Sequence, residues 1–112
     1  MLVYKILRQP EWAELREAGA LDGAPVDRAD GYVHLSTAEQ APGTAAKHFA
    51  GEDDLVLLAL DTAGLGDDLR WEPSRGGQNF PHLYRQLRVD DVMWWKPLPL
   101  SGAGHVFPPE MA

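Results

Sequence analysis

Residues 55–60 read Leu55-Val56-Leu57-Leu58-Ala59-Leu60, and every one of them is apolar. Successive side chains of a strand point to opposite faces of its sheet, so a strand without polar positions has two apolar faces. The run is also far too short for a membrane-spanning helix, which needs about 20 apolar residues. We therefore predict that these residues form the central strand of a sheet.

Segments on both sides of this run complete the fold. Further strands are predicted over residues 2–7, 32–35, 69–73 and 89–98, and residues 80–87 are expected to be structured. Helices are predicted over residues 11–18, ending at Gly19, and from the capping-box pattern Ser36-Thr37-Ala38-Glu39 onward, with a kink at Pro42. Residues 21–31 and 74–79 are predicted to be loops. The pattern indicates an α+β fold, a mixed or mainly antiparallel sheet with two to three helices on one side.

The length and composition limit the classes of function. We expect one domain over residues 1–100 and a loosely held tail over residues 101–112. The chain has no cysteine, which excludes disulfides, thiolate metal sites and a cysteine nucleophile. Its net charge is −7 and it lacks a basic cluster, so we expect no nucleic-acid partner. Without a signal-peptide pattern or a long apolar run, we expect a cytoplasmic protein that does not contact membranes.

The strand predicted near residue 33 has one polar face. By alternation, Val33 and Leu35 face the core, whereas Tyr32, His34 and Ser36 share the other face. An aromatic ring, an imidazole and a hydroxyl together are typical of a lined cleft or of a solvent face. Each has a structural alternative: Tyr32 as packing, His34 as a residue bonded to a neighbouring backbone group, and Ser36 as a helix N-cap.

Two flanking residues extend this candidate site. Asp30, followed by Gly31, can form a tight turn that lets a ligand approach the backbone, although Asp30 also suits a turn without any ligand. Thr37 is predicted at the start of a helix, where free backbone N–H groups attract carboxylates and phosphates. We therefore include Asp30 and Thr37 among the expected ligand-binding residues.

A second candidate group lies on the predicted strand over residues 69–73. Alternation places Leu69 and Trp71 inward and directs Arg70 and Glu72 to the other face. Glu72 is thus a candidate acid, base or acceptor for a sugar hydroxyl. A surface salt bridge to Arg70 or Arg75 is the structural alternative.

A third group is Phe80-Pro81-His82-Leu83-Tyr84, in which His82 and Tyr84 share a face opposite Leu83. His34, His82 and Glu72 lack the close spacing of a metal-binding motif, so we predict no metal site. Phosphate-binding loop and esterase-elbow motifs are absent from the sequence as well.

These motifs together resemble a bacterial family called domain of unknown function 952. The resemblance rests on residues 30–40, on Trp71-Glu72 and on residues 80–84, and it covers residues 3–98. The first motif is specific and the last is moderately so. Because that family has no established activity, the resemblance does not supply a reaction.

The family in turn resembles the ADP-ribosyltransferase superfold, whose members hold NAD in a cleft of a split sheet. Their strand motif of a His, any residue and a small hydroxyl residue resembles His34-Leu35-Ser36. The resemblance implies that this His and Ser bind a ribose, that Tyr84 or Phe80 stacks on a base, and that Glu72 acts as the catalytic acid beside His34. NAD or ADP-ribose would then be the ligand. The superfold carries its acid on a late strand, whereas Glu72 lies in mid-chain.

Three classes of function stay open, and each needs a different geometry. A small-molecule binding domain for a nucleotide-like or anionic ligand needs the polar residues to line one cleft, and we rank it first. An enzyme that transfers ADP-ribose, or processes NAD or ADP-ribose, also needs Glu72 aimed at the reacting atom. A structural or interaction protein would use Trp94 and Trp95 for self-association. The sequence leaves the oligomeric state open.

Overall fold

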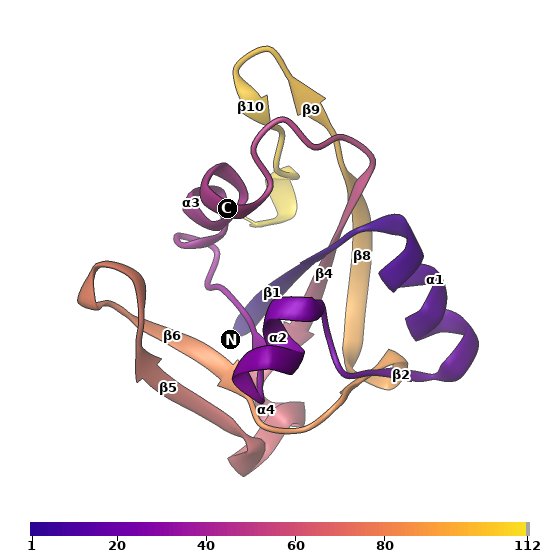
Figure 1. Cartoon of the computed structure of the whole chain (residues 1–112), viewed down its shortest axis with the longest axis vertical. Coiled ribbons are helices and arrows are strands. Elements are labelled where there is room, and N and C mark those ends of the chain that lie inside the picture. Colours follow the sequence, from indigo (N-terminus) through magenta and orange to yellow (C-terminus); the bar gives the residue numbers. More distant parts are fainter. Residues whose placement is uncertain (112) are drawn as a thin grey trace.

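The central sheet of the protein has three antiparallel strands. The computed structural model describes residues 1–111, except the side chain of Arg75. β4 (Leu55–Asp61) lies between β1 (Leu2–Leu7) and β8 (Val92–Leu98) (Figure 1). Residues 55–60 are at most 2% exposed. The apolar run therefore forms the central strand, as predicted, because both of its edges are paired and both of its faces are covered.

A second antiparallel sheet carries the predicted site residues. Its order is β3-β6-β5, formed by β3 (Val33–His34), β6 (Asn79–Leu83) and β5 (Leu69–Pro73). It meets the central sheet where Tyr4 and Ser36 exchange backbone hydrogen bonds of 2.7 and 3.0 Å. In Figure 1 the β5–β6 hairpin extends away from the central sheet.

Two short ladders complete the strands. β2 (Ala20–Leu21) pairs with β7 (Leu87–Arg88), and β9 (Leu100–Ser101) pairs with β10 (Gly104–His105). Every strand pair in the described part of the chain is antiparallel. The predicted α+β class with antiparallel sheets is therefore confirmed.

Four α-helices connect the strands within residues 1–111, against the two to three that the sequence predicts. They are α1 (Gln9–Ala18), α2 (Pro25–Asp30), α3 (Ala41–His48) and α4 (Thr62–Leu65). Short 3-10 helices occupy Gly66–Asp68, Arg75–Gly77, Val89–Asp91 and Pro109–Met111. None of the described helices combines the length and the apolar character needed to cross a membrane.

The segment predicted as a loop over residues 21–31 contains α2. Pro25 lies in its first turn, where a missing N–H is tolerated. The Asp27 side chain accepts a hydrogen bond of 2.7 Å from the backbone N–H of Ala24 and so caps the helix start. Gly31, with φ of 84°, ends it. Turn-forming residues outnumber apolar ones here, which is why the sequence suggested a loop. That prediction was wrong.

The next helix, α3, starts at Ala41, five residues after the predicted start at Ser36. The reciprocal bonds of a capping box do form, but between Thr37 and Gln40, at 3.1 and 3.2 Å. They close a turn ahead of the helix. Pro42 consequently lies in the first helical turn and does not kink α3, contrary to the prediction.

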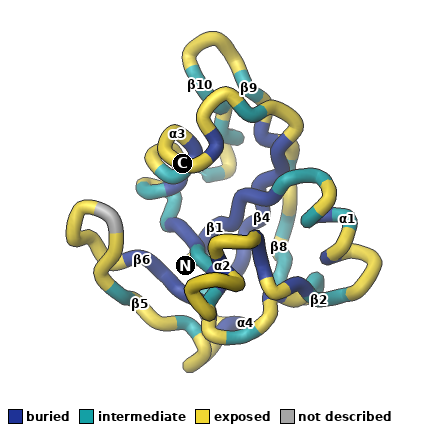
Figure 2. Tube along the Cα trace, viewed as in Figure 1, coloured by how far each residue is buried: buried dark blue, intermediate teal, exposed yellow. Residues whose placement is uncertain are grey.

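The helices α1 and α3 cover opposite faces of the central sheet, so the prediction of helices on one side was wrong. Trp12 and Leu15 of α1 join a core cluster with Val3 and Leu7 of β1. A second cluster, which includes Ala45 of α3, packs on the other face of the sheet. The dark blue trace of Figure 2 follows β1 and β4 between these layers.

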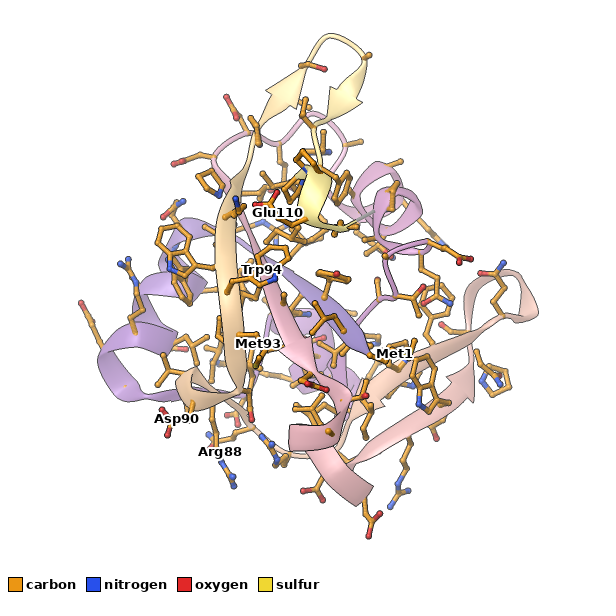
Figure 3. The ribbon with its side chains drawn as sticks, turned by 180° about the vertical axis from the view of Figure 1, so that it is seen from behind. Met1, Arg88, Asp90, Met93, Trp94 and Glu110 are labelled. Carbon is orange, nitrogen blue, oxygen red and sulfur yellow. The ribbon has the colours of Figure 1, made fainter. Side chains whose placement is uncertain are left out.

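The two adjacent tryptophans of β8 also separate onto these two faces. The ring of Trp94 lies 5.9 Å from that of Tyr4, and the ring of Trp95 lies 5.3 Å from that of Trp12. Figure 3 shows β8 from behind, with Trp94 and the exposed Met93 on successive positions. The tryptophans therefore do not form one joint patch.

One predicted inward residue faces solvent instead. Trp71 is 40% exposed, although Leu69, on the same side of β5, packs against the core. β5 is the edge strand of the smaller sheet, and its hairpin with β6 extends away from the central sheet (Figure 1). The inward prediction for Trp71 was therefore wrong.

The segment after residue 100 makes contacts with the second core cluster. Phe107 and Met111 pack against that cluster, and the His105 ring lies 2.7 Å from the Glu52 carbonyl oxygen. Glu110 forms an ion pair with Lys96. The division into a domain over residues 1–100 and a tail over residues 101–112 stays a prediction.

Candidate functional site

A cavity of about 720 Å³ opens between β1, α2, β3, α3 and β6. Cavities of about 300–1,000 Å³ are typical of small-molecule sites. Its lining includes the predicted residues Asp30, His34, Ser36, Phe80 and His82. The smaller sheet and the helix that follows β3 therefore bring together side chains from distant parts of the chain.

The cavity is more basic than the chain that surrounds it. Lys5, Arg8 and Lys47 line it together with one carboxylate, Asp30, although the net charge of the chain is −7. Arg8 donates to both carboxylate oxygens of Glu52, at 2.8 and 2.9 Å. Lys47 is exposed in the last turn of α3. The lining therefore favours an anion near the end of α3.

His34 lies between two carboxylates. Its Nδ1 is 2.5 Å from Asp27 Oδ1 and its Nε2 is 2.9 Å from Asp30 Oδ2. Carboxylate oxygens only accept hydrogen bonds, and a neutral imidazole has a single N–H. Whichever nitrogen carries the N–H, both ring nitrogens of His34 face a carboxylate oxygen. His34 is thus held in place by the two carboxylates.

Asp27 is the central residue of this network, and the sequence analysis missed it. It is 1% exposed, and its carboxylate accepts from Lys5 Nζ at 2.8 Å and from the backbone N–H groups of Ala24 and His34 at 2.7 and 2.9 Å. Burial alone would raise the pKa of Asp27, but the hydrogen bond from His34 and the charge of Lys5 lower it to about 2. Lys5, a charged residue within an apolar strand, was the signal that a buried partner exists.

The second histidine pairs with the predicted acidic residue. His82 Nδ1 lies 2.9 Å from Glu72 Oε1, and the Tyr84 hydroxyl donates to the same oxygen at 2.7 Å. Hydrogen bonds from Tyr84 and from His82 lower the pKa of Glu72. The same Tyr84–Glu72 bond raises the pKa of Tyr84. The predicted trio is therefore assembled around an ionised carboxylate.

The other ring nitrogen of His82 has a different environment. His82 is 2% exposed and lines the cavity. Its Nε2 is buried and makes no hydrogen bond to any described residue. Nδ1 is directed to Glu72, which lies outside the cavity lining, so Nε2 is the ring nitrogen that is left for another partner.

Tyr32 packs between the aromatic side chains of both groups. Its ring centroid lies 4.6 Å from that of His34, 4.1 Å from that of His82 and 5.2 Å from that of Tyr84. Burial raises the pKa of Tyr32, as does the nearby charge of Asp30. Tyr32 therefore stays a neutral phenol at neutral pH and packs against both imidazoles, whose own centroids lie 5.5 Å apart.

Four predicted residues lie outside the main cavity. Tyr32 and Tyr84 line a second hollow of about 390 Å³, and Thr37 and Glu72 line neither. The predicted single cleft is thus divided, and Glu72 reaches the main cavity through its hydrogen bond to His82 and its strand pairing with Phe80. The binding and catalytic roles of all these residues stay predictions.

Ser36 and Phe80 have structural contacts besides their place at the cavity. The Ser36 hydroxyl is 2.8 Å from Thr44 Oγ1, which joins the segment after β3 to α3. Phe80 is 6% exposed and adds an apolar ring to the wall. Within the described residues, no three His, Cys, Asp or Glu side chains gather as metal ligands.

A protein-family model matches residues 6–95, and the family is described as protein of unknown function, DUF952. The chain belongs to this family. The predicted resemblance is thereby confirmed at the level of the family. No curated protein matches the chain.

Two solved structures share the fold closely. A crystal structure of protein CC0527 from Caulobacter crescentus is 50% identical, covers 94% of this chain and 92% of that one, and has a TM-score of 0.90. The solution NMR structure of CC0527 is 51% identical, covers 93% of this chain and 90% of that one, and has a TM-score of 0.83. Because the DUF952 family has no assigned activity, function must be inferred from the site itself.

Proposed function

We propose that the protein binds a small anionic molecule with an apolar ring, such as a nucleotide, in the cavity beside α3. The observation that carries the proposal is His82, a residue of the cavity lining whose buried Nε2 has no partner among the described residues. Leaving a buried polar atom unbonded costs about 1–3 kcal/mol. A ligand that donates a hydrogen bond to this nitrogen removes that cost.

The chemistry of the cavity walls supports a ligand with two unlike parts. Phe49 and Phe80 offer apolar rings on which a planar base can pack. Lys47 supplies positive charge at the end of α3 for a phosphate or carboxylate. Asp30 and His82 can bind hydroxyl groups, as a ribose presents. Nucleoside phosphates, including NAD and ADP-ribose, combine all these features.

A thermal-shift series with AMP, ADP-ribose and NAD tests the proposal. A ligand that binds only the folded protein stabilises it and so raises its melting temperature. At a ligand concentration of 100 times the dissociation constant, the stabilisation is about 2.7 kcal/mol. We expect Lys47→Gln to reduce the shift and Arg16→Gln to preserve it. Both changes remove one positive charge, but Arg16 is an exposed residue of α1, which covers the other face of the sheet. No shift with any of the nucleotides, or equal losses in both variants, would contradict the proposal.

Processing of NAD or ADP-ribose is a second candidate function. It is favoured by the ionised Glu72 carboxylate placed behind His82, an arrangement shared with enzymes that use histidine as an acid or base. NAD turnover by the wild type that disappears in Glu72→Ala would support an enzyme. Nucleotide binding without turnover would leave the binding domain as the function.

A further inference from the structure

Glu72 determines which nitrogen of His82 carries the proton. At neutral pH the carboxylate can only accept hydrogen bonds, because the bonds from Tyr84 and His82 keep its pKa low. The 2.9 Å contact to Nδ1 therefore needs the N–H on that nitrogen. In the neutral ring, Nε2 is then left with a lone pair that no described residue uses.

The imidazole is also fixed in orientation before any ligand arrives. His82 lies on β6, paired with Arg70 of β5 on one side and with His34 of β3 on the other. The Tyr32 ring packs on it edge to face at 4.1 Å. A buried and pre-oriented lone pair needs little reorganisation when it accepts a proton.

His34, the other histidine at the cavity, cannot play the same part. Both of its ring nitrogens lie on carboxylate oxygens, those of Asp27 and Asp30. No lone pair of His34 is left to accept a proton from a ligand. Of the two histidines, only His82 therefore has a ring nitrogen that can accept a proton from a ligand.

From this geometry we propose that His82 is a catalytic base, acting on the bound molecule, and that Glu72 is its positioning residue. This inference rests on the proposed function, since the ligand must first occupy the cavity. Nε2 takes the proton of a water molecule or ligand hydroxyl while that oxygen bonds to an electrophilic atom of the ligand. The bond to the leaving group breaks with its electron pair, and the proton passes from Nε2 to the leaving group. No oxidant or reductant is required.

The tautomer can be measured directly by NMR of the ¹⁵N-labelled protein. We expect His82 to show a protonated Nδ1 and a lone-pair Nε2 in the wild type, and a mixture of tautomers in Glu72→Gln. The exposed Glu39, replaced by glutamine, is the matched control and should leave the His82 signals unchanged. A wild-type His82 with its proton on Nε2 would overturn the proposal.

The reactivity of the lone pair is tested with diethyl pyrocarbonate, which acylates unprotonated imidazole nitrogens. Its modification of His82 at Nε2, followed by mass spectrometry, should be about twofold slower in Glu72→Gln, because an even mixture of tautomers halves the population with a lone pair on Nε2. Modification of His105 in the same samples is the internal reference. An unchanged relative rate in Glu72→Gln would overturn the assignment of the base. Glu72-dependent reactivity without nucleotide binding would instead contradict the proposed ligand and leave the base assignment standing.

Discussion

Replacing Asp27 with asparagine removes the charge that balances Lys5 inside the protein. Lys5 is 7% exposed and Asp27 is 1% exposed, and their ion pair spans 2.8 Å. Asparagine has nearly the same shape, but its NH₂ group cannot accept the hydrogen bonds that one carboxylate oxygen now receives. The variant therefore leaves a buried ammonium group unpaired and at least one donor unsatisfied.

The expected loss can be worked out in two ways. Breaking a buried ion pair by removing one partner costs about 3–5 kcal/mol. Independently, the pKa of Asp27 falls from 3.8 to about 2, and at about 1.4 kcal/mol per pH unit this shift corresponds to about 2 kcal/mol. Burial opposes this shift, and the His34 hydrogen bond and the Lys5 charge cause it. We expect Asp27→Asn to lower the free energy of unfolding by about 3 kcal/mol at pH 7.

The loss should depend on pH in a defined direction. Because the folded-state pKa lies below the unfolded value, the charged carboxylate stabilises the protein fully above pH 3.8. That contribution disappears as the pH falls toward 2. The difference between wild type and Asp27→Asn should therefore shrink as the pH is lowered through this window.

Urea unfolding at several pH values measures these differences. Asp67→Asn removes the same charge from an exposed position and should change stability by less than about 0.5 kcal/mol. Combining Asp27→Asn with Lys5→Met should recover part of the loss, since no unpaired charge is then buried. A loss at neutral pH below about 1 kcal/mol would refute the buried network as a stabilising element.

Two further predictions concern the surroundings of the site. Gly23→Ala should lower the melting temperature, because φ of Gly23 is 106° and the new Cβ would lie 2.6 Å from Asp27 Cβ. Gly64→Ala is the control: its new Cβ meets no atom within 4 Å, so it should not lower the melting temperature. Tyr84→Phe should raise the pKa of Glu72, since the hydrogen bond from the Tyr84 hydroxyl is the largest cause of its low value. ¹³C NMR titration of the Glu72 carboxyl measures this pKa, and an unchanged value would contradict the prediction.

Some features of the fold follow from the sequence because their cause is local. The apolar run over residues 55–60 can be satisfied only by a strand covered on both faces. The end of α1 at Gly19, with φ of 80°, depends on a conformation that glycine adopts without strain. In both cases the residue types themselves exclude the alternatives.

Helix starts were harder to predict because several residues compete to cap them. Ser36 and Thr37 both have side chains suited to an N-cap, and the choice depends on where the chain enters the helix. Ser36 is held in a bridge to Tyr4 and bonded to Thr44. Tertiary contacts of this kind decide the local outcome and leave little trace in the sequence nearby.

Asp27 was missed for the same reason over a longer range. Its partner Lys5 lies 22 residues away, and its role appears only when α2 packs against β1 and β3. The Glu72–His82 pair was partly predictable, because strand alternation places both on faces that can meet. The pairing of Glu72 with Phe80 then puts the carboxylate diagonally beside His82.

The different environments of the two histidines follow from this strand register. His34 and His82 are direct partners across β3 and β6, with ring centroids 5.5 Å apart. Both ring nitrogens of His34 lie on carboxylate oxygens, those of Asp27 and Asp30, whereas His82 uses only its Nδ1, on Glu72. The carboxylates of α2 therefore occupy His34 fully, and of the two histidines only His82 keeps a ring nitrogen for a molecule that enters the cavity.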